Sequence, residues 1–351
     1  MLTPAGFREL HRPGEPFVLP NAWDLASARW LHADGHPVVG TTSLGVAFAA
    51  GRPDGTGETA VETVDLARRL TGAGIAVTVD MEAGFSDDPE EVGRYAAELA
   101  ELGVVGVNLE DSDAGGRLID PEFAARKIAA VAAAAPELYL NARTDPFWID
   151  RAGDGNRHRA DDPADRTREA VDRAHRYLAA GATGVFVPGA IPLDTIAALT
   201  RDIPAPVNVL VQPGVPVREL AAAGVARIST GSLLFRVALG AITAAARDIR
   251  DDRFVPGPAT PSERMPRAAR FGPSGEARHL VVGRRSGPGW AAPAWARPAS
   301  WGSRAGTAAR RARRRGRVAT IRAACRCVRG STAYPPTDRR PGGAGRARCG
   351  S

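Results

Sequence analysis

Short apolar runs alternate with longer segments of helical periodicity from residue 17 to about residue 250. The longer segments, such as residues 89–103, 120–135 and 165–181, repeat apolar positions at the spacing of an amphipathic helix. Gly ends several of them just before the next apolar run, as in "AELGVV", which is typical of a helix C-terminus. The apolar runs are predicted to be strands, at residues 17–19, 37–40, 75–80, 104–110, 138–143, 183–189, 206–211 and 225–230.

This alternation of strands and helices predicts a parallel sheet with helices outside it. Eight strands, each followed by a helix, within about 250 residues predict a (β/α)8 barrel. We expect this barrel to be the catalytic domain and to occupy residues 1–255. An open doubly wound sheet is the alternative, because periodicity does not show whether a sheet closes.

Residues 256–351 differ in composition, being rich in Arg, Gly, Ala and Pro and without apolar periodicity. From residue 266 onward there are 20 Arg and two acidic residues, a net charge of +18, so the preceding 265 residues carry −11 of the total of +7. The run "RRARRRGR" would suit a nucleic-acid-binding arm. The alternatives are a disordered tail unrelated to activity or the product of a frame shift in a GC-rich gene, and we expect one of these two, so nucleic acid is not an expected partner.

The three cysteines, Cys325, Cys327 and Cys349, all lie in this tail. The body therefore has no disulfide, thiolate metal site or catalytic Cys, which fits a reducing compartment. No apolar run approaches the roughly 20 residues of a membrane helix, and no early stretch resembles a signal peptide. A cytoplasmic enzyme that does not bind membranes is expected.

Acidic and polar residues gather where the predicted strands end. In a barrel of this type these ends form the mouth that carries the active site. Asp80 and Glu82 are two residues apart, so continued strand geometry would point both to the same side. The candidates on the other strands are Ser43, Leu44, Gly45 and Asp54 after the second, Glu110 and Asp111 after the fourth, Asn141, Arg143 and Asp145 at the fifth, and Asn208 on the seventh.

Carboxylates held this close repel each other unless a cation lies between them. Hard oxygen ligands favour Mg²⁺, and Arg143 suits a bidentate grip on an anionic substrate. Structural roles compete for each residue: a turn for Asp54, a helix N-cap for Glu82, an N-cap or loop position for Asp111, and a salt bridge for Arg143. The histidines show no ligand spacing, and His11, His32, His36, His158 and His175 are expected to be core or surface residues.

At these positions the sequence resembles the phosphoenolpyruvate mutase and isocitrate lyase superfamily, including carboxyvinyl-carboxyphosphonate phosphorylmutase-like proteins. The resemblance covers about residues 5–250, and the ordered series of motifs is more specific than any one of them. The motifs are "NAWDLASA", "TTSLGVAFAAGRPDG", "VTVDMEAGFSDDPEEV", "GVNLEDS", "NARTDPF", "RAHRYLAAGATGVFVPG" and "RISTG".

The resemblance implies a Mg²⁺-dependent isomerase or carbon–carbon lyase that acts on a small 2-oxo acid, carboxylate or phosphonate through an enolpyruvate-like intermediate. By the same resemblance Asp80 binds the metal, Glu82 holds its waters, and Asp54 and Glu110 complete the shell. Ser43, with the backbone of Leu44 and Gly45, would hold the substrate carboxylate. Arg143 would bind the transferred or departing anionic group, and Asn208 is a further substrate-binding candidate. Ser43, Asp54 and Arg143 are the predicted catalytic residues.

Two departures from the superfamily pattern narrow the reaction. Glu82 replaces the second Asp of the metal motif, and "DSDAGGRLIDPEF" replaces the gating loop whose Cys is the general acid of the lyases. We therefore expect phosphonomutase-like or decarboxylase-like chemistry. A carbon–carbon lyase or hydrolase of the same superfamily and an inactive metabolite-binding barrel are the alternatives.

The resemblance also implies assembly into a homo-oligomer through the C-terminal helix. This expectation depends on that helix being intact, since a frame shift would alter the chain after about Arg250.

Overall fold

The computed structural model describes residues 2–149 and 162–253. Nine strands in these residues form one sheet in which every neighbouring pair is parallel. Its strands are β1 (Phe17–Leu19), β2 (Asn21–Ala22), β3 (Val38–Thr41), β4 (Ala76–Asp80), β5 (Gly106–Glu110), β6 (Tyr139–Arg143), β7 (Gly184–Val187), β8 (Val207–Leu210) and β9 (Arg227–Ser229).

The order of the strands closes the sheet into a ring. From one edge to the other it runs β1, β9, β8, β7, β6, β5, β4, β3, β2. Only Pro20 separates β1 from β2, so one bent segment pairs with β9 on one side and with β3 on the other. This confirms the predicted barrel and excludes the open doubly wound sheet. Each of the eight predicted strands is present, and the two-residue β2 is an addition.

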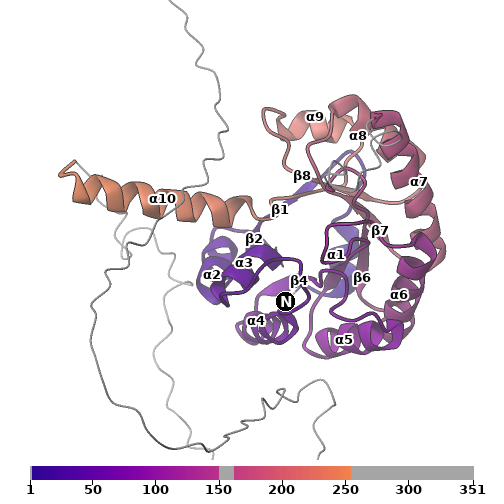
Figure 1. Ribbon diagram of the computed structural model, residues 1–351, viewed down its shortest axis with the longest axis horizontal. Helices are drawn as coiled ribbons and strands as arrows, with labels where there is room; N and C mark the ends of the chain where they lie inside the picture. The colour runs from indigo at the N-terminus through magenta and orange to yellow at the C-terminus, as the bar shows by residue number, and fades with distance from the viewer. Residues whose placement is uncertain (1, 150–161, 254–351) are drawn as a thin grey trace, which may run out of the picture. The chain divides into compact units, whose positions relative to one another are not determined.

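Most of the helices lie outside the strands (Figure 1), whereas α1 (Pro4–Glu9) packs against the end of the barrel. Four of them begin with Pro directly after an N-cap residue whose side chain accepts a backbone N–H, namely Thr3, Asp88, Asp120 and Asp162. Pro is favoured there because the first helical N–H has no partner within the helix. The helices are α1 (Pro4–Glu9), α2 (Leu25–Ala33), α3 (Ser43–Ala49), α4 (Ala60–Gly72), α5 (Pro89–Glu101), α6 (Pro121–Ala134), α7 (Pro163–Ala179), α8 (Leu193–Asp202), α9 (Val217–Ala222) and α10 (Leu233–Arg250).

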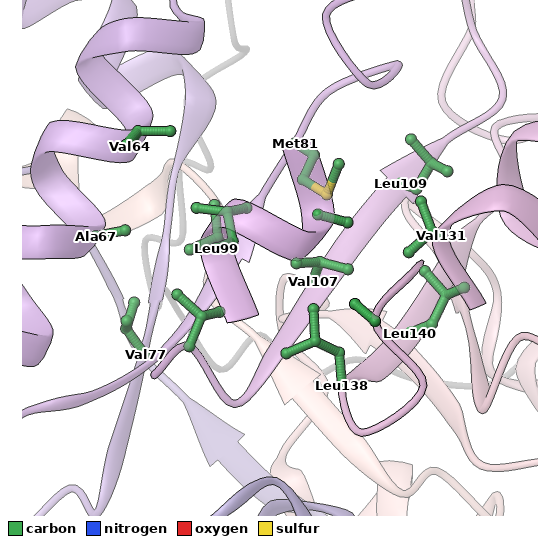
Figure 2. Close-up of a cluster of buried hydrophobic side chains, with 14 of the residues drawn as sticks. Val64, Ala67, Val77, Met81, Leu99, Val107, Leu109, Val131, Leu138 and Leu140 are labelled. Carbon is green, nitrogen blue, oxygen red and sulfur yellow. The ribbon is translucent and has the colours of Figure 1, made fainter. Parts of the chain in front are cut away.

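The largest hydrophobic cluster lies between the outer face of the strands and the helices (Figure 2). Val77 of β4 and Val107 of β5 point outward, where Ala67 of α4, Leu99 of α5 and Val131 of α6 cover them. Side chains alternate along a strand, so the next residues, Thr78 and Asn108, face the interior of the ring.

A smaller apolar cluster closes the base of the barrel, at the N-terminal ends of the strands. Phe7 of α1 is fully buried there and contacts the rings of Phe17, Tyr139 and His11 at centroid distances of 6.0, 5.5 and 4.8 Å. Leu19, Val38 and Ala76 complete the cluster on the strands. The base of the barrel is therefore closed by packed side chains.

Helix α10 extends to Arg250, and Phe235 is its only buried residue. The Phe235 ring contacts Trp23 and Phe48, at centroid distances of 5.2 and 6.0 Å. No helix in the described ranges is long and apolar enough to cross a membrane. The predicted tail lies outside the described residues, so the domain boundary near residue 255 stays a prediction.

Candidate functional site

Asp80, the last residue of β4, lies at the mouth of the barrel and has a free carboxylate oxygen. Its backbone N–H donates to Thr41 Oγ1 at 2.9 Å, and its carboxylate accepts the backbone N–H groups of Glu82 and Ser43. Oδ1 is buried and has no hydrogen-bond partner. Burial raises the pKa of Asp80, the charge of Arg143 opposes that rise, and Asp54 adds to it. Asp80 therefore has one carboxylate oxygen open to a ligand. The positive charge of its neighbours does not fully offset its burial.

Glu82 lies near Asp80, but not for the reason that the sequence suggested. The strand ends at Asp80, and Glu82 has a positive φ of 48°, so strand alternation does not apply to it. Its Oε1 accepts the Thr59 hydroxyl at 2.8 Å and its Oε2 accepts Gly57 N–H at 3.0 Å. Burial raises the pKa of Glu82, these hydrogen bonds oppose the rise, and Asp80 adds to it. The strand-based prediction was thus wrong, and so was an N-cap role, because Asp88 caps α5.

Arg143 ends β6 and lies between two carboxylates. It forms ion pairs with Glu110, the last residue of β5, and with Asp145, whose Oδ1 accepts Arg143 Nε at 2.7 Å. Burial lowers the pKa of Arg143, but Asp145, Glu110 and Asp80 outweigh it and the net shift is upward. Burial raises the pKa of Glu110 well above its ordinary value, with Arg143 opposing. The predicted salt bridge of Arg143 is present, and its role toward substrate stays a prediction.

Asp111, the residue after Glu110, belongs to a separate buried network. Its carboxylate accepts four hydrogen bonds, from the Asp145 N–H (2.9 Å), the Thr144 hydroxyl (3.0 Å), Arg173 Nη1 (3.0 Å) and the Tyr177 hydroxyl (2.7 Å). Asp111 is a loop residue, as one alternative held, and not an N-cap, because Asp120 caps α6. The network joins the loop after β5 to α7.

Ser43, Leu44 and Gly45 form the first turn of α3, where the backbone N–H groups have no partner within the helix. The Ser43 N–H is directed at Asp80, as described above. Gly45 is required by close packing, because a Cβ there would lie 2.6 Å from Trp23 Cβ and 2.9 Å from Thr42 Cγ2. The start of this helix is thereby held beside Asp80.

The two remaining predicted residues lie at different depths. Asp54 is exposed, in the loop between α3 and α4, yet its charge raises the pKa of Asp80 and of Glu82. Asn208 is buried two residues before the end of β8; its Oδ1 accepts the Ser229 hydroxyl at 3.1 Å and its Nδ2 has no partner. Asn208 therefore lies deeper in the barrel than a strand-end position.

A cavity of about 400 Å³ lies beside these residues. Gly57, Glu82, Ser112 and Lys127 are among its lining residues, and Glu82 is the only predicted site residue there. Lys127 of α6 is buried, and its Nζ donates to the Ala83 carbonyl at 3.0 Å. Burial lowers the pKa of Lys127, and Asp87 opposes that shift.

The carboxylates do not form a ready-made metal cage. In the described part of the chain, no group of three or more His, Cys, Asp or Glu side chains is arranged to hold a metal ion. Glu82 and Glu110 are already hydrogen-bonded or ion-paired, which leaves Asp80 Oδ1 as the free oxygen. This arrangement fits one direct carboxylate ligand with the other acids holding water molecules, which is how Mg²⁺ is usually bound.

Comparison with known proteins identifies the family of the chain. The family model described as Phosphoenolpyruvate phosphomutase matches residues 7–250. An uncharacterized protein of Mycobacterium tuberculosis is 44% identical over 250 residues, which cover 71% of this chain and 91% of that protein. A putative phosphonomutase from Burkholderia cenocepacia J2315 is 36% identical in its crystal structure, with a TM-score of 0.64, covering 70% of this chain and all of the other.

A 2-methylisocitrate lyase of Halalkalibacterium halodurans is more distant, at 27% identity over 209 residues, which cover 57% of this chain and 64% of that enzyme. The match to the family model extends over most of the chain and includes every strand from β1 to β9. The chain therefore belongs to the phosphoenolpyruvate phosphomutase family, within the phosphoenolpyruvate mutase and isocitrate lyase superfamily of enzymes.

Proposed function

We propose that this barrel is a Mg²⁺-dependent enzyme that converts a small 2-oxo acid or phosphonate through an enolpyruvate-like intermediate. The observation that carries the proposal is the set of carboxylates at the barrel mouth, the buried Glu82 and the partly buried Asp80 and Glu110, whose pKa values burial raises. Arg143 offsets Asp80 and Glu110, and Glu82 is offset only by hydrogen bonds from Thr59 and Gly57, so this mouth suits a cation. A divalent metal would supply the positive charge that stabilises an enolate oxygen.

Each residue of the site then has a role that follows from its position. Asp80 offers its free Oδ1 to the cation, and Glu82 and Glu110 would hold metal-bound water. The first turn of α3 presents backbone N–H groups to a substrate carboxylate. Arg143 lies at the mouth on β6, two strands from Asp80, with the Trp148 and Phe186 rings 5.4 and 5.9 Å from its guanidinium carbon. Its remaining N–H groups suit a second anionic group.

Phosphonomutase-like or decarboxylase-like chemistry fits this site better than isocitrate-type cleavage. The loop after β5 is a tight turn closed by the Asp113 to Arg117 ion pair (2.8 Å) and an isolated bridge between Ser112 and Leu118. It contains no Cys, and residues 1–265 contain none. A general acid of that kind is therefore missing from the chain segment where the lyases carry it.

A substrate screen tests the proposal. Purified protein with Mg²⁺ is incubated with oxaloacetate, phosphonopyruvate, phosphoenolpyruvate, dimethylmalate and methylisocitrate, and products are followed by proton and phosphorus NMR. We expect turnover of phosphonopyruvate, phosphoenolpyruvate or oxaloacetate that is lost in Asp80→Asn and on chelation. Turnover that survives both changes would contradict the metal role, and turnover of methylisocitrate alone would make the enzyme a carbon–carbon lyase.

We also propose that the chain forms a homo-oligomer through α10. The helix is formed over Leu233–Arg250, and the residues from 254 onward, on which an intact C-terminus also depends, lie outside the described ranges. It exposes several large apolar side chains, namely Val237, Leu239, Ile242 and Ile249. Light scattering should give an assembly larger than one chain, and Ile242→Asp should dissociate it; a monomeric wild type would refute this.

A further inference from the structure

The interior of the barrel has an unusual composition one step beneath the mouth. Barrels of this type are ordinarily filled there by branched apolar side chains. Here most of the inward-facing positions are polar, and on β4, β5 and β6 they lie two residues before Asp80, Glu110 and Arg143, on the same face. We call this set the polar layer; it consists of Thr78, Asn108, Asn141, Asn208, Arg227 and Ser229.

Arg227 crosses this layer. It begins β9 and is fully buried, yet its Nη2 donates to Asn108 Oδ1 at 3.0 Å, on β5 across the ring. Its Nε donates to Ser229 Oγ at 3.1 Å, and its Nη1 has no partner. Within residues 2–149 and 162–253, Arg227 forms no ion pair with a carboxylate. Burial lowers the pKa of Arg227 to about 10, so the guanidinium keeps its charge at neutral pH.

Arg173 shows what a structural buried arginine looks like in the same molecule. Its Nη1 pairs with the Asp111 carboxylate at 3.0 Å and also contacts the Tyr177 hydroxyl and the Ile119 carbonyl. A buried charge with such partners holds segments of the chain together. Its removal leaves the partner carboxylate buried and unpaired. Arg227 has no comparable partner. An unpaired buried charge is expensive to keep, and exceptions of this kind are expected at functional sites.

The position of Arg227 indicates what its charge acts on. Asn108, which Arg227 contacts, is the cross-strand neighbour of Asp80 in the β4–β5 register. The Arg227 charge therefore interacts with the Asp80 carboxylate at the mouth, and also with Tyr139 at the base. In this poorly hydrated interior its charge is screened less than at the surface.

We infer that Arg227 is a positioning residue that acts through Asn108 and Asp80: its fixed charge offsets part of the carboxylate charge and weakens the binding of a divalent cation at the mouth. The inference rests on the proposed metal site. When the protein's carboxylates neutralise less of the cation's charge, more of that charge remains to attract an anionic substrate. A residue with only a structural role would have the opposite effect, because its loss would loosen the site.

Two variants separate charge from shape. Arg227→Met removes the charge at similar volume, and Arg227→Lys keeps the charge. With Mn²⁺ alone as the probe, measured by electron paramagnetic resonance, we expect Arg227→Met to lower the Kd at least about threefold. Arg227→Lys should stay within about twofold of wild type. The melting temperature of Arg227→Met should be no lower than that of wild type, because replacing a buried charge by Met is often neutral or stabilising.

Arg173→Met is the matched control. It should lower the melting temperature clearly and leave the Mn²⁺ Kd of the folded protein unchanged. If Arg227→Met binds Mn²⁺ with equal or weaker affinity, or if both Arg227 variants fail to fold, Arg227 is structural and the inference is overturned. If folded wild-type protein does not bind Mn²⁺, the proposed metal site itself fails and the inference falls with it.

Discussion

The base of the barrel is buried and the mouth is partly buried, and the two ends differ in the charge of their ionisable groups. At the base, His11 stacks on Tyr139 with a centroid distance of 3.8 Å, and burial lowers the His11 pKa to about 3 and raises that of Tyr139. Both groups are therefore neutral. At the mouth, burial also raises carboxyl pKa values, but Asp80, Glu82 and Glu110 are supplied with donors and with Arg143. Burial alone thus does not mark a site; a cluster of carboxyl groups whose desolvation is only partly offset does.

The strongest way to test this contrast is to remove the free carboxylate. Asp80→Asn should lower kcat/KM at least about a thousandfold, about 4 kcal/mol of transition-state stabilisation. The free energy of unfolding should stay the same or rise, because a desolvated carboxylate is lost. Steady-state kinetics and urea unfolding measure the two effects. Glu101→Gln, which alters an exposed acid at the end of α5 away from the cavity, is the control, and a large loss of activity there would contradict the assignment.

The base should show the reverse pattern. Phe7 is fully buried against three rings, so Phe7→Ala should lower the free energy of unfolding by about 3 to 4 kcal/mol. The kcat of the folded fraction should not change. Val18→Ala, at a partly exposed position of β1, should cost much less. A fall in kcat without loss of stability in Phe7→Ala would break the distinction between the two ends.

The neutral His11 at the base should make the free energy of unfolding depend on pH. Its pKa is lowered in the folded protein, from 6.5 to about 3, so the unfolded chain binds more protons between these values. Stability from this group is complete above about pH 6.5 and is lost as pH falls toward 3, by at most about 1.4 kcal/mol per pH unit. His11→Phe should remove this part of the slope. Unfolding curves with identical slopes in wild type and variant would show that His11 does not titrate this way.

The smallest expected effect concerns the support of Glu82. Thr59→Val removes the hydroxyl that donates to Glu82 Oε1 at 2.8 Å, and losing one hydrogen bond to a charged group costs about 1.5 kcal/mol or somewhat more. We expect Mn²⁺ affinity to fall severalfold, measured by calorimetry. Thr56→Val changes an exposed hydroxyl in the same loop and should have no effect. An unchanged affinity in Thr59→Val would mean that Glu82 does not depend on this contact.

The sequence predicted the barrel well because the patterns that indicate strands and helices are local. Strand runs, helix-ending glycines and N-cap residues such as Asp88 and Asp120 each depend on a few neighbouring residues. The same locality placed Asp80, Glu110 and Arg143 at strand ends. It missed β2, since two residues after Pro20 carry no pattern.

Features that depend on distant parts of the chain could not be predicted. The conformation of Glu82 was misread because a positive φ at a residue other than Gly leaves no pattern in the sequence. Arg173 and Tyr177 were missed because they meet Asp111 across 62 and 66 residues. Arg227 was not recognised either, as only the closed ring brings it to Asn108.

The buried amine of Lys127 has a practical consequence, because it is the only lysine in the sequence. A lysine-directed reagent can therefore modify only one side chain. That side chain is hydrogen-bonded to the Ala83 carbonyl at the wall of the cavity. The rate at which it is labelled would therefore report how often this wall opens. Mass spectrometry could follow that opening without an engineered probe, and could compare it before and after a ligand is added.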